Sequence, residues 1–295
     1  MPRDDAPKGD TLFAHTLSDE DERARKVRGV PEPTLWHRLH FFWAIFWISL
    51  TTIPFSLALM TAYHFSPTAR TFKRWSSRWA RVILGGIGVS LDVEDRSELT
   101  PEAPCLFVAN HQNLLDIFTT AAAIPYPFGY LAKKELTRVP FLSLALRHSP
   151  SLFIDRSSRR ASMRSLASAV QSIREGQSVL FFAEGSRAYA PAMHPFKKGA
   201  FYVAAKAGVP LVPVTIRDSY RVMDERHYAS RPGTIRLTIG APIALEDFES
   251  DDTPAVMNAV RERMEAELAG ERRRAEGEEA AADPSAGGTA QNGEP

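Results

Sequence analysis

A histidine and an aspartate five positions apart are the residues of this chain best suited to moving a proton. His111 and Asp116 stand in the stretch Asn-His-Gln-Asn-Leu-Leu-Asp, directly after the apolar run 105–109. A buried strand that ends here and turns into a helix would present the imidazole at the rim of a sheet. With Asn113 as the helix N-cap, the Asp116 carboxylate can hold one ring nitrogen, which leaves the other to take a proton from a hydroxyl. The alternative for an isolated pair with this spacing is a capping histidine at a strand end.

A second charged stretch, Phe-Ala-Glu-Gly-Ser-Arg, follows the apolar strand pattern Val-Leu-Phe. Gly185 allows a close turn, Arg187 can bind a phosphate or carboxylate through two hydrogen bonds, and Glu184 can hold the arginine or a substrate hydroxyl. Ten residues later, Lys197 and Lys198 are predicted to open a helix whose free N–H groups also attract anions. The alternative is a surface loop of salt bridges.

Two further patterns end or form strands. Phe-Ile-Asp-Arg places Arg156 at a strand end, with Asp155 beside it to orient it, and Val-Pro-Leu-Val-Pro-Val at 209–214 is apolar throughout. We expect the first to add a cation to the same sheet edge and the second to form a wall of the site or an acyl-chain passage. Together the four patterns predict one cleft for a ligand with a phosphate, a hydroxyl and an apolar chain.

Composition excludes several other classes of protein. With 36 basic against 35 acidic residues, bulk charge predicts no nucleic-acid partner. Cys105 is the single cysteine, so neither an intramolecular disulfide nor a cysteine-based metal site can form. A metal at His111 is not expected either, because no other His, Asp or Glu cluster accompanies it. The sequence has no P-loop, no Gly-x-Gly-x-x-Gly and no Gly-x-Ser-x-Gly, which are the usual signatures of nucleotide hydrolysis, dinucleotide redox chemistry and serine hydrolases.

The N-terminal part predicts a disordered segment, 1–34, followed by a membrane-anchoring helix pair over 35–84. Residues 41–63 carry no formal charge, and as a helix they would extend about 34 Å, against a hydrocarbon core of about 30 Å. Pro54 and nearby hydroxyl groups leave open whether this segment spans the bilayer or lies in one leaflet. The next stretch, 67–84, is amphipathic and basic, which suits an anionic lipid surface; the alternative is a helix packed on its own domain. Its basic residues are Arg70, Lys73, Arg74, Arg78 and Arg81.

From residue 85 to 270 the pattern predicts one α/β catalytic domain, a mixed, largely parallel sheet of about seven strands flanked by helices. The last helix is predicted over 254–268, and the acidic, small-residue-rich segment 271–295 is predicted to be a disordered tail. The predicted strands lie at 89–93, 104–109, 128–132, 151–154, 178–183, 211–216 and 235–239. The other helices are predicted at 114–123, 140–147, 159–174 and 197–207.

The four motifs, NHQNLLD, FIDR, FAEGSR and VPLVPV in this order, resemble those of the glycerolipid acyltransferases, in particular bacterial 1-acyl-glycerol-3-phosphate acyltransferase. The resemblance covers roughly residues 70–245. The third motif departs from the family pattern because Ala183 and Ser186 stand where the family usually has Pro and Thr. Neither change removes a charged group, so we expect activity to survive.

The resemblance implies acyl transfer from acyl-CoA or acyl-carrier protein to the hydroxyl of lysophosphatidic acid, giving phosphatidic acid without a cofactor or a covalent acyl-enzyme. His111 would be the general base and Asp116 its orienting partner. The substrate-binding residues would be Arg156, Glu184, Gly185, Ser186, Arg187, Lys197 and Lys198. The partners would be the lipid bilayer, a lysophospholipid acceptor and the acyl donor, with the catalytic domain on the cytoplasmic face of the cell membrane.

Three alternatives stay open at this point. The acceptor could be another lysolipid or glycerol 3-phosphate, the chain could be a non-catalytic lipid-binding member, or water could be the acceptor, as in a thioesterase. Acyl-chain length, the choice between coenzyme A and carrier protein, and the oligomeric state leave no signal in the sequence.

Overall fold

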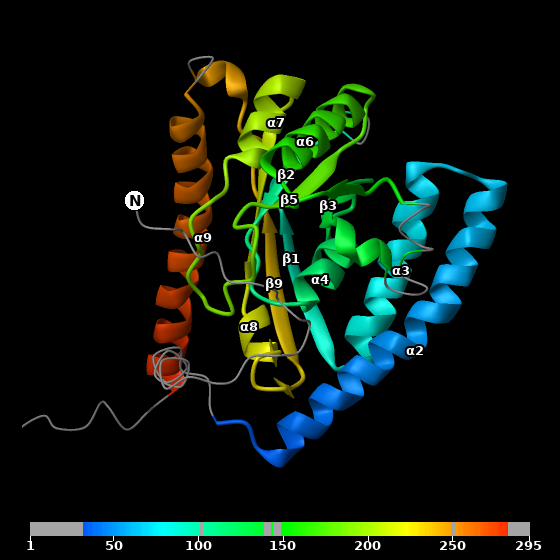
Figure 1. Cartoon of the computed structure of the whole chain (residues 1–295). Coiled ribbons are helices and arrows are strands. Elements are labelled where there is room, and N and C mark those ends of the chain that lie inside the picture. The colour runs from blue at the N-terminus through cyan, green and yellow to red at the C-terminus, as the bar shows by residue number, and fades with distance from the viewer. Residues whose placement is uncertain (1–31, 101–102, 139–142, 144–148, 249–251, 283–295) are drawn as a thin grey trace, which may run out of the picture.

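A seven-stranded sheet forms the centre of the computed structural model, which describes residues 32–100, 103–138, 143, 149–248 and 252–282 (Figure 1). The strand order is β1-β9-β6-β2-β5-β3-β4. All seven strands match runs predicted from the sequence. They are β1 (Val89–Asp95), β2 (Leu106–Ala109), β3 (Gly129–Lys133), β4 (Leu152–Ile154), β5 (Val179–Phe182), β6 (Leu211–Arg217) and β9 (Gly233–Ile239).

The sheet is parallel except at one pair, β6 with β9. Strands β6, β2, β5, β3 and β4 therefore run one way, and β9 and β1 run the other. The prediction of a mixed, largely parallel sheet is confirmed. Because β2, β4 and β5 run in the same direction, the three charged motifs at their ends leave the sheet at one edge.

Helices cover both faces of the sheet. The side chains of β2 point alternately to the two faces, and both sets are buried. Phe107 and Ala109 pack with α3 and α4, whereas Leu106 and Val108 pack with α6, α7 and α9. This alternation is the period of two expected for a strand buried on both faces. The helices are α2 (Leu35–Phe65), α3 (Ala69–Gly86), α4 (Leu115–Ala123), α6 (Arg159–Arg174), α7 (Gly199–Ala207), α8 (Ser219–Val222) and α9 (Thr253–Ala282), with short 3₁₀ turns η1 (Lys134–Arg138) and η2 (Leu245–Asp247).

The N-terminal helices α2 and α3 form a pair along one side of the domain (Figure 1). The indoles of Trp43 and Trp47 donate hydrogen bonds to the carbonyls of Gly86 and Val82, each at 3.0 Å. In the described part of the chain, α2 is the one helix long and apolar enough to cross a membrane, and it continues through Pro54 without interruption. Its exposed large apolar side chains are Leu35, Trp36, Leu39, Phe42, Trp43, Phe46, Leu50, Ile53, Leu57 and Phe65.

A small hairpin that the sequence did not predict connects α2 to the rest of the domain. Strands β7 (Met223–Asp224) and β8 (Ala229–Ser230) form a separate two-stranded sheet. His40 Nδ1 on α2 lies 2.7 Å from Ser230 Oγ. The ring of Phe41 meets that of Tyr228 edge to face at 5.8 Å. The hairpin is too short for the periodicity of its strands to be read from sequence.

The C-terminal helix departs from the prediction. Helix α9 continues to Ala282, so residues 271–282, predicted to belong to a disordered tail, are helical. The acidic composition suggested disorder, but Ala, Glu and Arg are also strong helix formers, and here their propensity extends the preceding helix. The predicted disorder of 1–31 and 283–295, and the predicted helix at 140–147 apart from residue 143, lie outside the described residues.

Candidate active site

His111 and Asp116 meet at the carboxyl end of β2, where the chain turns into α4. His111 Nδ1 lies 2.8 Å from Asp116 Oδ2. The imidazole side chain is 12% exposed, whereas the carboxylate is fully buried. The two residues can touch because His111 precedes the helix and Asp116 lies in its first turn.

Four donors surround the Asp116 carboxylate. Besides the His111 ring, Oδ2 accepts hydrogen bonds from the backbone N–H groups of Gln112 (2.5 Å) and Asn113 (2.9 Å). Oδ1 accepts one from the Ser219 hydroxyl at 2.5 Å. An ionised carboxylate only accepts, so the proton between the pair belongs to His111 Nδ1 and the lone pair belongs to Nε2. The ring therefore has the tautomer that a general base requires.

The N-cap prediction for Asn113 is corrected. The cap position is Leu114, and the side-chain oxygen of Asn113 accepts from the N–H of Leu115 at 2.7 Å. The amide group of Asn113 donates to the carbonyls of Ser219 and Met223. Asn113 therefore fastens the start of α4 to the segment that comes after β6, in addition to satisfying the helix terminus.

Phe182 fixes the plane of the imidazole. It is the last residue of β5, paired across the sheet with Ala109, and its ring stacks on His111 with centroids 4.0 Å apart and planes 17° apart. Tyr130 continues the stack on the other side, at 6.4 Å from Phe182. Sequence reasoning treated Phe182 only as the start of the charged motif. Because β2 and β5 are neighbouring strands, the residues at their carboxyl ends could have indicated the contact between Phe182 and His111.

Glu184 does not hold Arg187, which corrects one of its two predicted roles, and its contact with a substrate hydroxyl stays a prediction. Its buried carboxylate accepts the backbone N–H of His111 at 2.7 Å and of His194 at 2.6 Å. These two buried donors need an acceptor, and Glu184 supplies it. Burial raises the pKa of this carboxyl to about 7, although both N–H groups favour the charged form. Glu184 thus joins the His111 loop to the 184–196 loop.

Arg187 is held by Glu225, a residue that sequence reasoning missed. A guanidinium N–H of Arg187 donates to Glu225 Oε2, and the backbone N–H of Leu114 donates to Oε1. Burial raises the pKa of Glu225, opposed by the positive charge of Arg187. The arginine side chain stays 25% exposed, so its remaining donors can reach a ligand. The charged run Asp-Glu-Arg-His after β6 was the signal in the sequence.

The remaining predicted cations lie at the surface of the same edge. Arg156 is exposed and donates from Nη1 to the carbonyl of Gly185 at 3.0 Å. Gly185 has φ +73°, and a Cβ added there would lie 3.2 Å from Cγ of Lys197. Ser186, Lys197 and Lys198 are exposed. The structure therefore brings Arg156, Gly185 and Lys197 together.

Two expectations about neighbours of these cations are wrong. Asp155 does not orient Arg156: its carboxylate accepts the N–H of Ser157 at 3.0 Å and the ammonium group of Lys134 at 2.9 Å, whereas Arg156 donates to the carbonyl of Gly185. Helix α7 starts at Gly199, with Lys198 as its cap residue, so Lys197 and Lys198 precede the helix.

The apolar motif 209–214 is a core strand and not a wall of the site. Every residue of β6 is buried, and its side chains pack into the layers on both faces of the sheet. The motif acts on the site through the segment at its carboxyl end, because Ser219 in that segment donates to Asp116. The position of β6 between β2 and β9 explains why the motif is apolar throughout.

At this edge of the sheet, His111 Nε2 is a basic nitrogen, and the positive charges come from Arg156, Arg187 and Lys197. A ligand with an anionic group on Arg187 or Arg156 could present a hydroxyl to His111 Nε2. Among the described residues, no group of three or more His, Cys, Asp or Glu side chains is placed to hold a metal ion.

Known proteins resemble this chain in sequence. Residues 90–217 match the family model described as Acyltransferase. A 1-acyl-sn-glycerol-3-phosphate acyltransferase of Saccharomyces cerevisiae is 31% identical over 181 residues, covering 60% of this chain and 59% of that protein. The chloroplastic LPAT1 of Arabidopsis thaliana, with the same activity in its name, is 30% identical over 223 residues, covering 72% of this chain and 61% of that protein.

A solved structure shares the fold. The 1-acyl-sn-glycerophosphate acyltransferase PlsC from Thermotoga maritima superposes with a TM-score of 0.71 at 20% identity, covering 81% of this chain and 97% of that chain. The chain spans about 60% of the length of the two curated relatives above. The resemblance to the glycerolipid acyltransferases that the motifs indicated is confirmed.

Proposed function

We propose, because residues 90–217 match the family model described as Acyltransferase, that this chain transfers an acyl group to the free hydroxyl of 1-acyl-sn-glycerol-3-phosphate and forms phosphatidic acid. The observation that carries the proposal is the His111–Asp116 contact at 2.8 Å, with the ring partly exposed. The backbone N–H of Ala188, the residue after Arg187, donates to the carbonyl of His111 at 2.7 Å and holds the two segments together. The names of the relatives supply the acceptor.

The transfer is a direct displacement. Nε2 of His111 takes the proton of the acceptor hydroxyl while the oxygen attacks the thioester carbonyl of the donor, and Asp116 stabilises the imidazolium. The C–S bond then breaks, the acyl group stays on the acceptor oxygen, and the imidazolium returns its proton to the leaving thiolate. Such a base contributes about 10²–10⁴ in rate.

Arg187 and Arg156 bind the acceptor phosphate in this proposal, with Lys197, Lys198 and Ser186 at the rim. Glu225 and Glu184 position this loop through Arg187 and through the His111 backbone. Gly185 lets Arg156 reach the loop carbonyl. Two arginines suit a phosphate because each can donate two parallel hydrogen bonds.

The donor is a thioester of coenzyme A or of acyl-carrier protein, and no cofactor is required. We further propose that α2 docks the enzyme on the cell membrane with the catalytic domain on the cytoplasmic face, where such donors are made. The support is the exposed apolar side of α2. Activity retained in EDTA would support the absence of a metal requirement.

The test is product identification by mass spectrometry. Purified protein is incubated with one acyl-CoA and a panel of acceptors: lysophosphatidic acid, other lysophospholipids and glycerol 3-phosphate. We expect phosphatidic acid from the first, and loss of at least 10²-fold in rate in His111→Ala. His64→Ala, which changes an exposed histidine at the end of α2, is the matched control.

Three outcomes would contradict the proposal in different ways. Turnover of another acceptor but not of lysophosphatidic acid would refute the substrate. Consumption of acyl-CoA at the same rate without an acceptor would indicate a thioesterase. Undiminished acyl transfer in His111→Ala would refute the base.

A further inference from the structure

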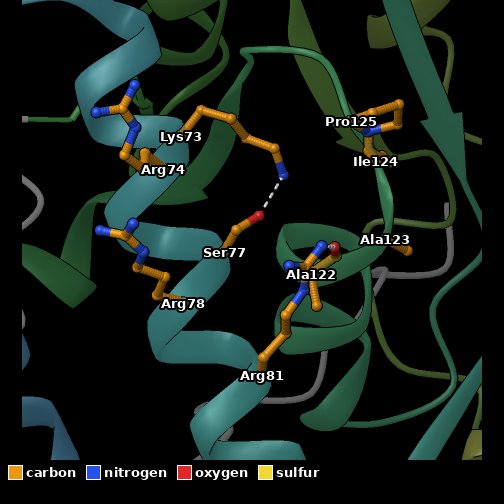
Figure 2. A pocket seen from close by; sticks show the side chains of 9 residues that line it. All are labelled: Lys73, Arg74, Ser77, Arg78, Arg81, Ala122, Ala123, Ile124 and Pro125. Atoms are coloured by element: carbon orange, nitrogen blue, oxygen red, sulfur yellow. Dashed lines mark hydrogen bonds between the residues drawn. The ribbon is translucent and has the colours of Figure 1, made fainter.

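A pocket of about 420 Å³ lies between α3 and the last turn of α4, outside the candidate active site (Figure 2). We call it the α3–α4 pocket. Asp116 is in the first turn of α4 and the pocket is at the other end, about 9 Å further along the helix axis at 1.5 Å per residue. The residues that line it are Lys73, Arg74, Ser77, Arg78, Arg81, Ala122, Ala123, Ile124 and Pro125.

Four basic side chains and no acidic one line the pocket. In the described part of the chain, no carboxylate forms an ion pair with Lys73, Arg74, Arg78 or Arg81. The positive charge of Arg81 acts on the Lys73 ammonium group, and like charges repel each other. A bound anion would remove this repulsion.

Helix capping accounts for only part of this arrangement. Lys73 Nζ donates to the carbonyl of Ala121 at 2.6 Å and to the Ser77 hydroxyl at 2.8 Å, and Arg81 donates to the carbonyl of Ala122 at 3.3 Å. These contacts satisfy the C-terminal carbonyls of α4 and suit its helix dipole. They leave the net charge uncompensated.

Lys73 is the most strongly affected base of the pocket. Burial, with a smaller contribution from the positive charge of Arg81, lowers the pKa of its ammonium group to about 7. Its ammonium group also lies over the ring of Phe128, 5.7 Å from the centroid. Figure 2 shows Lys73, Ser77 and Arg81 reaching toward α4, whereas Arg74 and Arg78 project from the other side of α3.

The surroundings of the pocket favour a lipid as the source of the anion. Helix α3 packs between α4 and α2, and α2 turns a row of large apolar side chains outward. A bilayer contacting that row would place phosphate groups near α3, because basic residues beside an apolar helix lie at the depth of the headgroups.

We propose that the α3–α4 pocket binds the phosphate group of an anionic membrane phospholipid, which is neither the acceptor nor the donor of the reaction. Lys73 and Arg81 contact the phosphate from inside the pocket, and Arg74 and Arg78 lie at its rim. The proposal goes beyond the acyl transfer and rests on the membrane docking of α2.

The first experiment measures binding to vesicles by co-sedimentation. The vesicles are phosphatidylcholine alone or phosphatidylcholine with phosphatidylglycerol. The measurement is made at pH 6, below the pKa of Lys73, so that the pocket pair Lys73→Gln/Arg81→Gln and the rim pair Arg74→Gln/Arg78→Gln remove the same charge from the same helix. Arg263→Gln, an exposed position on α9 on the opposite face of the sheet, is the distant control.

We expect the rim pair to reduce partitioning onto phosphatidylglycerol vesicles by up to about 30-fold, the value for two basic residues near an anionic surface. The pocket pair should reduce it by several-fold more, and neither pair should affect binding to phosphatidylcholine alone. Equal losses in the two pairs would overturn the pocket in favour of a diffuse electrostatic attraction.

The second experiment uses the unaltered chain, because Lys73→Gln also removes a cap of α4. Lysines are ¹³C-methylated, and the Lys73 signal is titrated in lipid nanodiscs. With phosphatidylglycerol present, its titration should move to higher pH, and with phosphatidylcholine alone it should not. An unmoved signal, or the same shift produced by coenzyme A without lipid, would overturn the proposal. Acyl transfer to a micellar acceptor should be unchanged in the pocket pair, which separates this test from that of the catalytic site.

Discussion

Replacing Asp116 by asparagine tests the catalytic pair while leaving its hydrogen bonds in place. Oδ2 of Asp116 accepts three N–H donors, from His111 Nδ1 and from the backbone of Gln112 and Asn113. The carbonyl oxygen of an asparagine can take that position. Its NH₂ group would then face the Ser219 hydroxyl, which can accept it and donate instead to Gln112 Oε1, 2.9 Å away. The substitution therefore removes a charge and little else.

The size of the effect depends on the charge that develops on the ring. In the proposed step the imidazole becomes imidazolium beside a carboxylate whose oxygen lies 2.8 Å from Nδ1. Two unit charges about 4 Å apart attract each other by about 4 kcal/mol at an effective dielectric constant of about 20. We expect kcat to fall by about 10³-fold in Asp116→Asn, since about 1.4 kcal/mol corresponds to a factor of ten.

The assay is thiol release from acyl-CoA at saturating acceptor, run on the wild type, Asp116→Asn, His111→Ala and the double variant. Because the two residues act as one unit, the double variant should be no slower than His111→Ala. Thermal unfolding should shift by only a few degrees in Asp116→Asn. A variant that keeps more than a tenth of the wild-type kcat, or a double variant in which the two losses multiply, would refute the pairing.

Three further predictions concern residues around the pair. The pKa of Glu184 is about 7 in the folded chain, above the ordinary 4.5, so its contribution to stability is complete below pH 4.5 and is lost as pH rises through 7, by about 3 kcal/mol. In urea unfolding, Glu184→Gln should lose this part of the pH dependence of the free energy of unfolding. The same pH dependence in the variant and the wild type would contradict the prediction. Gly185→Ala forces a side chain into φ +73° and against Lys197, so KM for the acceptor should rise and the free energy of unfolding should fall by about 1 kcal/mol; unaltered values of both would show that the turn is not strained. Burial raises the pKa of the Cys105 thiol to about 12, so a thiol reagent at pH 8 should label it only after unfolding; rapid labelling of the native chain would contradict the burial.

The sequence predicted the central strands of the sheet well because they are buried on both faces. Residues of β2, β5 and the first four positions of β6 are apolar without interruption, and strands of this kind stand out between helical patterns. The prediction of a disordered tail failed because the composition of that segment is compatible with both disorder and a helix. Residues 271–282 are both charged enough to suggest disorder and rich enough in helix formers to extend α9.

The candidate site was predictable to the extent that its residues lie just after strands. His111, Arg156 and Arg187 come after parallel strands, so the topology brings them to one edge. The partner of each charge was not predictable, because it depends on contacts between distant segments. Glu225 is 38 positions from Arg187, and Ser219 is 103 positions from Asp116. Glu184 was misplaced for the same reason: the sequence does not reveal that two backbone N–H groups converge on it.

The β7–β8 hairpin links α2 to the candidate active site. One part of it touches α2 through Ser230 and Tyr228, and Glu225 in its turn holds Arg187. A bilayer in contact with the outer side of α2 would thus be linked to Arg187 through this short hairpin and not through a long flexible segment. The height of Arg187 above the lipid surface would then be set by the fold, so a substrate still embedded by its tail would need to rise only a fixed distance to reach it.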